Sequence, residues 1–439
     1  GGIPLYKGGD PVGAIGVISD GLYSIDPNIG DYDNDKDELI AMAGTVGFEP
    51  PFDIKGNRIT VEGKNFRYTD RKIRSIRSNP LTALPYDQIP RSVGGLTPIG
   101  TYFDGTVRPG TVFGTGPSGY RANTTGDYGT LNAFVLVDSN DQPRFPPRDG
   151  TEGTPESLTA NEVRTIIRNA LTIAFRARAQ IRRPLGSHAQ VTVSVVDTNG
   201  SILGIARTPD GPVFGTDVSL QKARTAAFFS NTNTAADLIR ANLGNYWLAA
   251  KAVLGPGALS DGTAFADRSG GNLSRPFFPD GIDGAPHGPF SKPFSEWSPF
   301  NVGLQLDLIA ANIVAHRSFL LGQSSTDTPM NCTPIPVRPQ TSKSPVANGI
   351  QIFPGSVPIY RNNTLIGGIG VSGDGIDQDD MISFLGLHNA GLELGTGVGN
   401  APRLIRADNL EVPGGRLRYV NCPFLPFLDS NEQTPCNGK

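Results

Sequence analysis

The sequence predicts an α+β protein in which an antiparallel sheet is flanked by helices. Three observations predict this class: apolar runs paired about tight turns, amphipathic helical runs between those pairs, and one hairpin–helix unit that occurs twice. Helices packed against an antiparallel sheet are a stable way to bury the apolar faces of both kinds of element. Long irregular insertions are expected as well, because the chain contains 55 Gly and 37 Pro residues.

Length and charge limit the possible functions. The 439 residues allow two to three domains at about 150 residues each. The formal net charge of −3 gives no field of one sign that would attract nucleic acid or an anionic membrane. No run approaches the roughly 18 apolar residues that a membrane-spanning helix needs. We therefore expect neither nucleic acid as a partner nor a membrane span.

The first elements are a hairpin and a helix. Residues 3–17 place two apolar runs on either side of a Gly-Gly-Asp turn, which predicts a β-hairpin. Residues 37–48 follow as a short amphipathic helix. Residues 51–157 are rich in Gly, Pro, Thr and Asp with short β runs, and we interpret them as an irregular β-rich bridge.

The middle of the chain predicts helix, hairpin and helix. Residues 158–180 begin with a capping box of Thr159 and Glu162 and continue with apolar residues at helical spacing. In the hairpin 189–208, Asn199-Gly200 is expected to supply the positive φ angles of the turn. A second helix is expected at 217–230.

The remaining elements surround an insertion at 231–348. Two helical patches lie inside it, at 234–254 and 301–321. A hairpin at 355–371 and a closing helix at 377–391 follow. A Pro-rich tail covers 394–439.

The tail contains two of the three cysteines, Cys422 and Cys436. A disulfide closing a loop of about 15 residues stabilises a fold by roughly 3 kcal/mol in the chain-entropy model. We predict this disulfide and hence an oxidising compartment. Cys332 is left over and is expected to pair with something outside this chain.

The chain contains an internal repeat. Residues 12–17 align with 366–371, and residues 37–44 align with 379–386. Residues 1–50 therefore correspond to only the C-terminal half of a domain. We expect the rest of that domain upstream, on a cleaved or unlisted segment or a second chain, because a hairpin and one helix are too small to bury a core.

Three blocks of the sequence resemble a known family. Residues 191–211, 220–230 and 355–381 are similar, in order and spacing, to the motif blocks of the GlcG/HbpS-type haem-degrading (haem-binding) domain. The resemblance implies a profilin/PAS-like three-layer domain over 158–393, interrupted by the insertion, and a half-domain at 1–50. The arrangement looks like the secreted tandem-domain members of this family in bacteria.

The resemblance implies a periplasmic or extracellular accessory protein that binds haem non-covalently and forms an oligomer. The family has no universal haem ligand, so no ligand residue is carried over. The alternative is a structural or assembly protein that forms an oligomer or a complex with a separate N-terminal chain. An enzyme is the less favoured interpretation, because no catalytic constellation emerges from the sequence.

Four residues of the resembling blocks are candidates for holding an anionic group such as a haem propionate. They are Arg207, Lys222, Arg224 and Thr225. The alternative is structural: Lys222 and Arg224 would pair with Asp197 or Asp217.

An acidic run is a candidate calcium site. Its carboxylates recur at every second residue, at Asp31, Asp33, Asp35 and Asp37. The run is not a complete EF-hand, since Lys36 and Met42 stand where the loop needs Gly and Glu. The alternative is a solvated acidic loop that caps the following helix.

Other motifs are given structural interpretations. The pattern GIGVSG at 368–373 follows the second arm of a hairpin, so close backbone packing is favoured over nucleotide binding. The sequence has no C-x-x-C-H motif for covalent haem. The four histidines, His188, His287, His316 and His388, show no metal-binding spacing; His316 and His388 are expected to be structural, and His287 lies in a loop that looks exposed.

Overall fold

The computed structural model describes residues 1–21, 30–61, 64–96, 98, 104–297, 303–328 and 331–439. The chain forms two compact units, Gly1–Val107 and Arg108–Lys439. Each unit is described by itself. The domain boundaries predicted from the sequence at residues 50, 157 and 393 stay predictions.

The α-helices, in chain order, are α1 (Lys36–Gly44), α2 (Ala160–Arg176), α3 (Gly215–Phe229), α4 (Thr234–Arg240), α5 (Gly244–Leu254), α6 (Asp267–Leu273), α7 (Gly303–Asp307), α8 (Ala310–Leu320) and α9 (Ile376–Leu394).

The strands, in chain order, are β1 (Gly2–Lys7), β2 (Asp10–Gly16), β3 (Thr60–Val61), β4 (Lys64–Asn65), β5 (Tyr120–Ala122), β6 (Phe134–Leu136), β7 (Thr192–Val196), β8 (Ile202–Arg207), β9 (Ser356–Arg361), β10 (Thr364–Ser372), β11 (Val398–Asn400), β12 (Glu411–Val412) and β13 (Gly415–Arg416).

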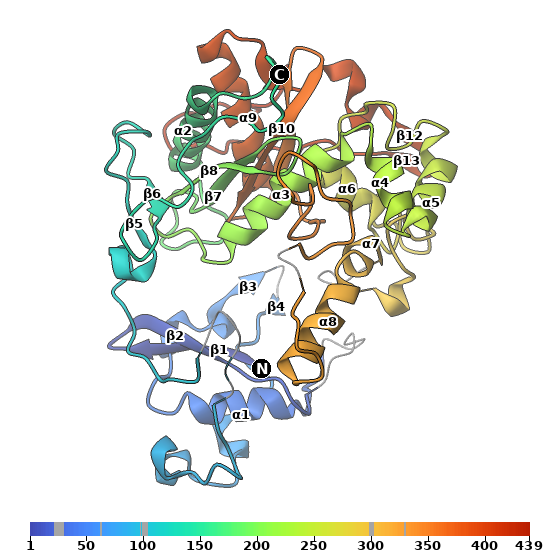
Figure 1. Ribbon diagram of the computed structural model, residues 1–439. Coiled ribbons are helices and arrows are strands. Elements are labelled where there is room, and N and C mark those ends of the chain that lie inside the picture. Colours follow the sequence, from blue (N-terminus) through green and yellow to red (C-terminus); the bar gives the residue numbers. More distant parts are fainter. Residues whose placement is uncertain (22–29, 62–63, 97, 99–103, 298–302, 329–330) are drawn as a thin grey trace. The chain divides into compact units, whose positions relative to one another are not determined.

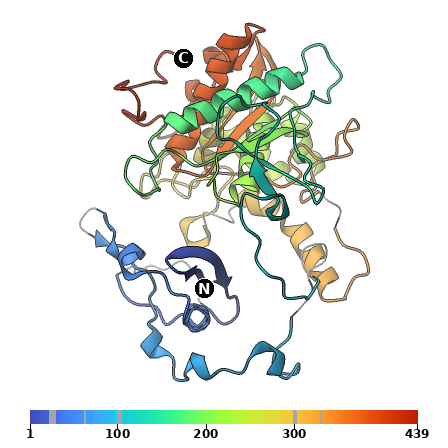
Figure 2. The ribbon, with the colours of Figure 1, turned by 90° about the vertical axis from the view of Figure 1, so that its left-hand side faces the viewer.

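The first unit contains the predicted hairpin and helix. Strands β1 and β2 pair antiparallel, and Figure 2 shows them as a curved dark-blue ribbon. Helix α1 begins after Asp35, whose carboxylate accepts a hydrogen bond from the Glu38 N–H. The buried apolar cluster of this unit is small and consists of Ile3, Ala41 and Met42.

The second unit is built on an antiparallel sheet of seven strands, in the order β11-β9-β10-β7-β8-β6-β5. The hairpins β7–β8 and β9–β10 lie at its centre, paired through β10 and β7. Strands β5 and β6 join the sheet through the pairing of Phe134 with Arg207. Part of the expected bridge therefore belongs to this sheet.

Helices cover both faces of the sheet, which gives three layers (Figure 1). On one face α2 packs against α9, and a Cβ at Gly386 of α9 would lie 2.6 Å from the Ala170 Cα, so glycine permits the close crossing. The apolar side of α2 is fully buried and includes Val163, Ile166 and Ile167. The fold class predicted from the sequence is confirmed.

Helix α3 covers the other face of the sheet. A Cβ at Gly368 would lie 2.2 Å from the Ala223 carbonyl oxygen, and one at Gly370 would lie 2.1 Å from that of Ser219. Any side chain at either glycine would force α3 away from the sheet. The glycines of the 368–373 pattern therefore serve close backbone packing.

The insertion forms a second apolar core beside the end of α3. Phe228 and Phe229 of α3 pack there with Phe265, Phe290 and other apolar side chains of the insertion. No helix among the described residues is long and apolar enough to cross a lipid bilayer.

Local details agree with the sequence in part. The capping box of Thr159 and Glu162 is present at the start of α2. At the β7–β8 turn only Gly200 has a positive φ (+75°), so the expectation for Asn199 is wrong. The reason is that the Asp197 carboxylate accepts hydrogen bonds from the N–H groups of Asn199 and Ser201 and holds a different turn.

Each predicted helical patch of the insertion contains two helices rather than one. The first patch breaks between α4 and α5, where Asn242 takes a left-handed φ of +59°. The second contains α7 and α8; its first two residues, 301–302, lie outside the described residues.

Candidate functional site

A cluster of buried charges lies where α9 begins. Helix α3 contributes Lys222, α6 contributes Asp267 and Arg268, and the first turn of α9 contributes Asp379 and Asp380. All five side chains are at most 9% exposed. Ionised groups are rarely buried unless they are paired, so their partners decide what the cluster can do.

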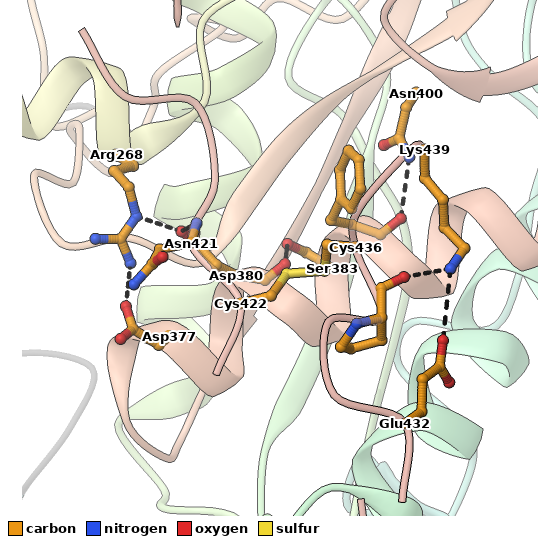
Figure 3. The surroundings of a disulfide bond; sticks show 12 residues. Arg268, Asp377, Asp380, Ser383, Asn400, Asn421, Cys422, Glu432, Cys436 and Lys439 are labelled. Atoms are coloured by element: carbon orange, nitrogen blue, oxygen red, sulfur yellow. Dashed lines mark hydrogen bonds and ion pairs between the residues drawn. A yellow bond between two sulfur atoms is a disulfide. The ribbon is translucent and has the colours of Figure 1, made fainter. Parts of the chain in front are cut away.

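Two ion pairs organise the cluster. The Lys222 Nζ lies 2.9 Å from the Asp379 Oδ2 and also donates to the Val371 carbonyl oxygen. The Arg268 Nε lies 2.5 Å from the Asp380 Oδ2. Figure 3 shows the Arg268 guanidinium between Asp380 and Asp377. These pairs tie α3 and α6 to the start of α9.

Asp267 is the one acidic group of this cluster without such a partner. Its side chain is completely buried and neither carboxylate oxygen makes a hydrogen bond. Burial raises the pKa of Asp267 well above its usual value, against the opposing effect of Lys222. Burial likewise raises the pKa of Asp379 and of Asp380 to about 6.

Gly355, just before β9, makes the lysine position possible. Its φ is +138°, and a Cβ there would lie 2.6 Å from the Lys222 Nζ. Any larger residue would both strain the backbone and displace the ammonium group. The glycine therefore belongs to the packing of the ion pair.

A pocket of 490 Å³ opens beside Phe384 of α9 and the C-terminal tail. Its walls include Arg403, Arg406, Phe384 of α9 and Tyr419. The Arg406 guanidinium lies over the rings of Phe384 and Tyr419, 5.3 Å and 5.2 Å from their centroids. The volume falls within the range of small-molecule sites.

The disulfide holds the tail against this pocket. Cys422 and Cys436 both line it and are joined as predicted (Figure 3). The Asn421 N–H donates to the Asp380 Oδ2, so the same segment also contacts the charged cluster. Cys332 is a free, exposed cysteine.

Tyr419 of the pocket wall and His388 of α9, which is not among the residues that line the pocket, both have shifted pKa values. His388 lies one turn of α9 after Phe384, and burial together with the charges of Lys439 and Arg406 lowers its pKa. Its imidazole is therefore neutral at neutral pH. The Tyr419 hydroxyl is buried without a hydrogen-bond partner, and burial raises its pKa.

The four predicted anion-binding residues have different surroundings. Lys222 is in the charged cluster. Arg224 donates to the Gly200 carbonyl and the Asn348 side chain, and burial lowers its pKa to about 10. The Thr225 hydroxyl accepts from the Gln351 N–H.

Arg207 is the fourth of these residues and is fully buried. Its guanidinium lies 4.6 Å from the Tyr120 ring centroid, and its Nη1 has no hydrogen-bond partner. Burial lowers its pKa. Of the four, Arg207 is therefore the one with an unused donor, and its anion-binding role stays a prediction.

The predicted calcium ligands take other roles. Asp35 caps α1, as the alternative interpretation expected, and Asp37 accepts a hydrogen bond from the Ser19 N–H. Asp37 is buried rather than solvated. Within the described parts of the chain, which include Asp31 and Asp33, no three acidic, His or Cys side chains are arranged to hold a metal ion. The calcium prediction has no support from this geometry.

Sequence reasoning missed Asp267, Arg268, Arg403, Arg406 and Tyr419. The first two lie in a Gly/Pro-rich insertion and the others in a tail without periodicity, so no spacing connects them to α9. The only signal was the expected disulfide, which indicated that the tail would be held against the fold.

Part of the chain is similar to a known protein family. The model of the family described as "Haem degrading protein HbpS-like" matches residues 310–387, which include β9, β10 and most of α9. The resemblance expected from the sequence is confirmed over this segment. No curated protein matches the chain.

Two solved structures are similar to the chain at low identity. A crystal structure of a PduOC–haem complex is 17% identical over 56% of this chain and 99% of its own, with a TM-score of 0.25. A crystal structure of the Klebsiella pneumoniae protein ORFY is 16% identical over 55% of this chain and 94% of its own, also with a TM-score of 0.25.

Proposed function

We propose that the second unit binds haem or a related tetrapyrrole non-covalently and acts by binding rather than by catalysis. The observation that carries this proposal is the match of residues 310–387 to the haem-degrading family model. Helix α9 belongs largely to this segment and also forms a wall of the 490 Å³ pocket. The disulfide supports a periplasmic or extracellular location, because disulfides persist in oxidising compartments.

The residues of the pocket fit a tetrapyrrole with acidic side groups. Arg403 and Arg406 would hold the propionates, since guanidinium groups pair well with carboxylates. Phe384 and Tyr419 offer aromatic surface, and the unpartnered Tyr419 hydroxyl could donate to an acidic oxygen. His388 offers a neutral imidazole, the form that binds iron. Bound haem would supply an iron centre that could take a nitrogen ligand such as this imidazole.

Titration of the full, oxidised chain with haem tests this placement. We expect a saturable shift of the Soret band, with the dissociation constant raised about tenfold in Arg403→Gln because one charge-assisted contact is lost. Arg416→Gln is the matched control, as Arg416 is an exposed arginine that pairs with Glu411 outside the pocket. Unchanged binding in Arg403→Gln would overturn the placement, and a missing Soret shift would overturn the function.

The same titration of Arg207→Gln tests the other predicted anion site. If Arg207→Gln weakens haem binding and Arg403→Gln does not, the ligand lies at β8. The non-catalytic part of the proposal predicts a Soret band that persists when ascorbate is added in air. A band that decays only with intact protein would contradict it.

Assembly is a second candidate function, favoured by one feature of the first unit. Its hairpin and helix expose Val12, Ile18 and Ile40, the second of them by 88%. Such surface suits completion by a second copy or by a separate chain that supplies further strands. Light scattering of the purified chain should then show an oligomer or a co-purifying partner, and a monodisperse monomer would exclude the second copy.

A further inference from the structure

The first unit contains a separate cavity of 580 Å³. All its lining residues lie within residues 3–73, and the run 65–69 and 71–73 forms much of its wall. This basic run has no role in the second unit and none in the proposed haem site. The cavity is therefore a distinct feature of the molecule.

Aromatic rings line this cavity with much of their surface uncovered. Tyr32 is 66% exposed, Phe52 is 64% exposed and Phe66 is 56% exposed. Single exposed aromatic residues are common on proteins, but three on one concave wall are not explained by chance exposure. Arg58 lies 4.6 Å from the Phe52 centroid and Arg67 lies 4.7 Å from that of Tyr32, so a flat ligand would contact the ring surface that these cations leave exposed.

The lining is also positively charged. Lys55, Arg71 and Lys72 line the cavity, and in the described part of the chain none of them has a carboxylate within 4.0 Å of its charged nitrogens. Arg67 lines it as well, but it pairs with Asp70 at 2.7 Å. Among the lining residues that the structure describes, Glu49 is the one acidic residue. The balance favours an anion.

Two hydrogen-bond donors in the wall lack acceptors. Within the described residues, the Tyr68 hydroxyl and the Arg71 Nε are both buried and make no hydrogen bond. Leaving a buried donor unsatisfied costs about 1–3 kcal/mol. Both residues line the cavity, so an acidic oxygen there is a candidate acceptor for either group, whereas an apolar ligand could accept from neither.

Helix α1 fixes the basic run in this position. The Glu38 carboxylate accepts hydrogen bonds from the N–H groups of Asp70 (3.0 Å) and Arg71 (3.0 Å). Lys55 lies 5.2 Å from the Tyr68 ring centroid, and Lys72 lies 5.6 Å from that of Tyr32. Cations and aromatic faces therefore alternate along the wall.

We infer that the first unit binds a flat, conjugated organic anion, with its ring system against Tyr32, Phe52 and Phe66 and its acidic group on Tyr68, Arg71 and Lys72. Ring stacking and charge pairing then act on two parts of one ligand. This site is independent of the haem site proposed for the second unit.

The experiment uses the full, oxidised chain and the fluorescent probe 1-anilinonaphthalene-8-sulfonate, a flat aromatic anion. We expect saturable enhancement of fluorescence, with the dissociation constant raised at least tenfold in the double variant Arg71→Gln, Lys72→Gln. The control is Lys7→Gln, Arg91→Gln, which removes two cations from the same unit at exposed positions outside the cavity. Unchanged probe binding in Arg71→Gln, Lys72→Gln would overturn the inference. Equally weakened binding in this variant and in the control would overturn it as well.

A second comparison separates the charge from the ring. N-phenyl-1-naphthylamine has the same rings without the sulfonate, and we expect it to bind at least tenfold more weakly than the anionic probe. Phe66→Leu should weaken the binding of both probes, because the ring that contacts them is lost. Phe66 is exposed, so its replacement leaves the small core intact. Equal affinity for both probes would overturn the anionic part. Arg403→Gln, in the pocket of the second unit, should leave the binding of the anionic probe unchanged, so failure here does not depend on the proposed function.

Discussion

The hairpin and helix β1–β2–α1 and the hairpin and helix β9–β10–α9 share a sequence pattern but have opposite surroundings. Strand β10 is buried along most of its length between α3 on one face and α9 on the other. Strand β2 is exposed at almost every residue, and its unit has only a small apolar cluster. The pattern determines the local structure in both places, whereas burial depends on what else packs against it.

The acidic residues at the helix starts show the same difference. Asp379 and Asp380 are paired with a lysine and an arginine inside the protein. The aligned Glu38 of the first unit instead accepts from the backbone of the basic run. One sequence feature therefore stabilises a core in one copy and positions a cavity wall in the other.

The largest expected difference concerns two lysines near the aligned helix starts. Lys222→Met leaves the Asp379 carboxylate buried without its cation, which should cost about 3–5 kcal/mol in unfolding free energy. Lys36→Met removes only an exposed ion pair, in which the Lys36 Nζ lies 3.9 Å from the Asp20 Oδ2. It should change the unfolding free energy by less than about 0.5 kcal/mol. Urea denaturation measures both. Equal effects would mean that the two surroundings do not differ energetically.

A second pair of variants compares the aligned isoleucines. Ile369→Ala creates a cavity in the main core and should cost about 3 kcal/mol, because Ile369 is fully buried. Ile15 is only partly buried against the small cluster of the first unit. Ile15→Ala should therefore cost less than half as much, measured by thermal unfolding followed at each unit. A larger loss from Ile15→Ala would show that the first unit has a more extensive core.

A third comparison concerns the turns of the two hairpins, where Lys7 aligns with Arg361. Arg361 binds both carboxylate oxygens of Glu162, so Arg361→Met should lower the unfolding free energy by about 2 kcal/mol. Lys7→Met should leave the unfolding free energy nearly unchanged. The burial penalty on Glu162 is outweighed mainly by hydrogen bonding to Arg361, and its pKa falls to about 2.

Because the pKa of Glu162 is lower in the folded state, its stabilisation is present above pH 4.5 and is lost as the pH falls toward 2. Urea denaturation at pH 3 and pH 7 should show this loss in the unchanged chain and a smaller one in Arg361→Met. The same acid sensitivity in both would mean that Arg361 does not control Glu162.

The last expected effect is a pH dependence specific to the buried cluster. Burial raises the pKa of Asp379 and of Asp380 from 3.8 to about 6. It also raises the pKa of Asp267 well above its usual value. The folded chain therefore holds protons that the unfolded chain releases. The unfolding free energy contributed by these groups should fall as the pH rises through about 4 to 6.

The variant Asp267→Asn measures the contribution of Asp267 to this pH dependence. The variant should be more stable than the unchanged chain at pH 7, and its stability should fall less steeply with pH, by up to about 1.4 kcal/mol per pH unit. Asp210→Asn, at an exposed carboxylate paired with Arg182, is the control. Parallel curves for Asp267→Asn and the unchanged chain would show that Asp267 is ionised in the folded state.

The sequence predicted the local structure better than the candidate site. Capping at Thr159, the central hairpins and the disulfide follow from local patterns, and the structure contains them. The break at Asn242 depends on a left-handed residue inside an apolar run that periodicity does not distinguish. The grouping of Asp267 and Arg268 with α9 depends on tertiary packing across about 110 residues, for which no local signal exists.

The most direct test of the account is the haem spectrum of two histidine variants of the full, oxidised chain. His388 follows the pocket residue Phe384 by one turn of α9 but does not itself line the pocket, whereas His316 is half-exposed on α8 and pairs with Asp327. The account predicts a saturable Soret shift that is altered or lost in His388→Ala and unchanged in His316→Ala. No shift with the unchanged chain, or the same spectrum in both variants, would contradict it.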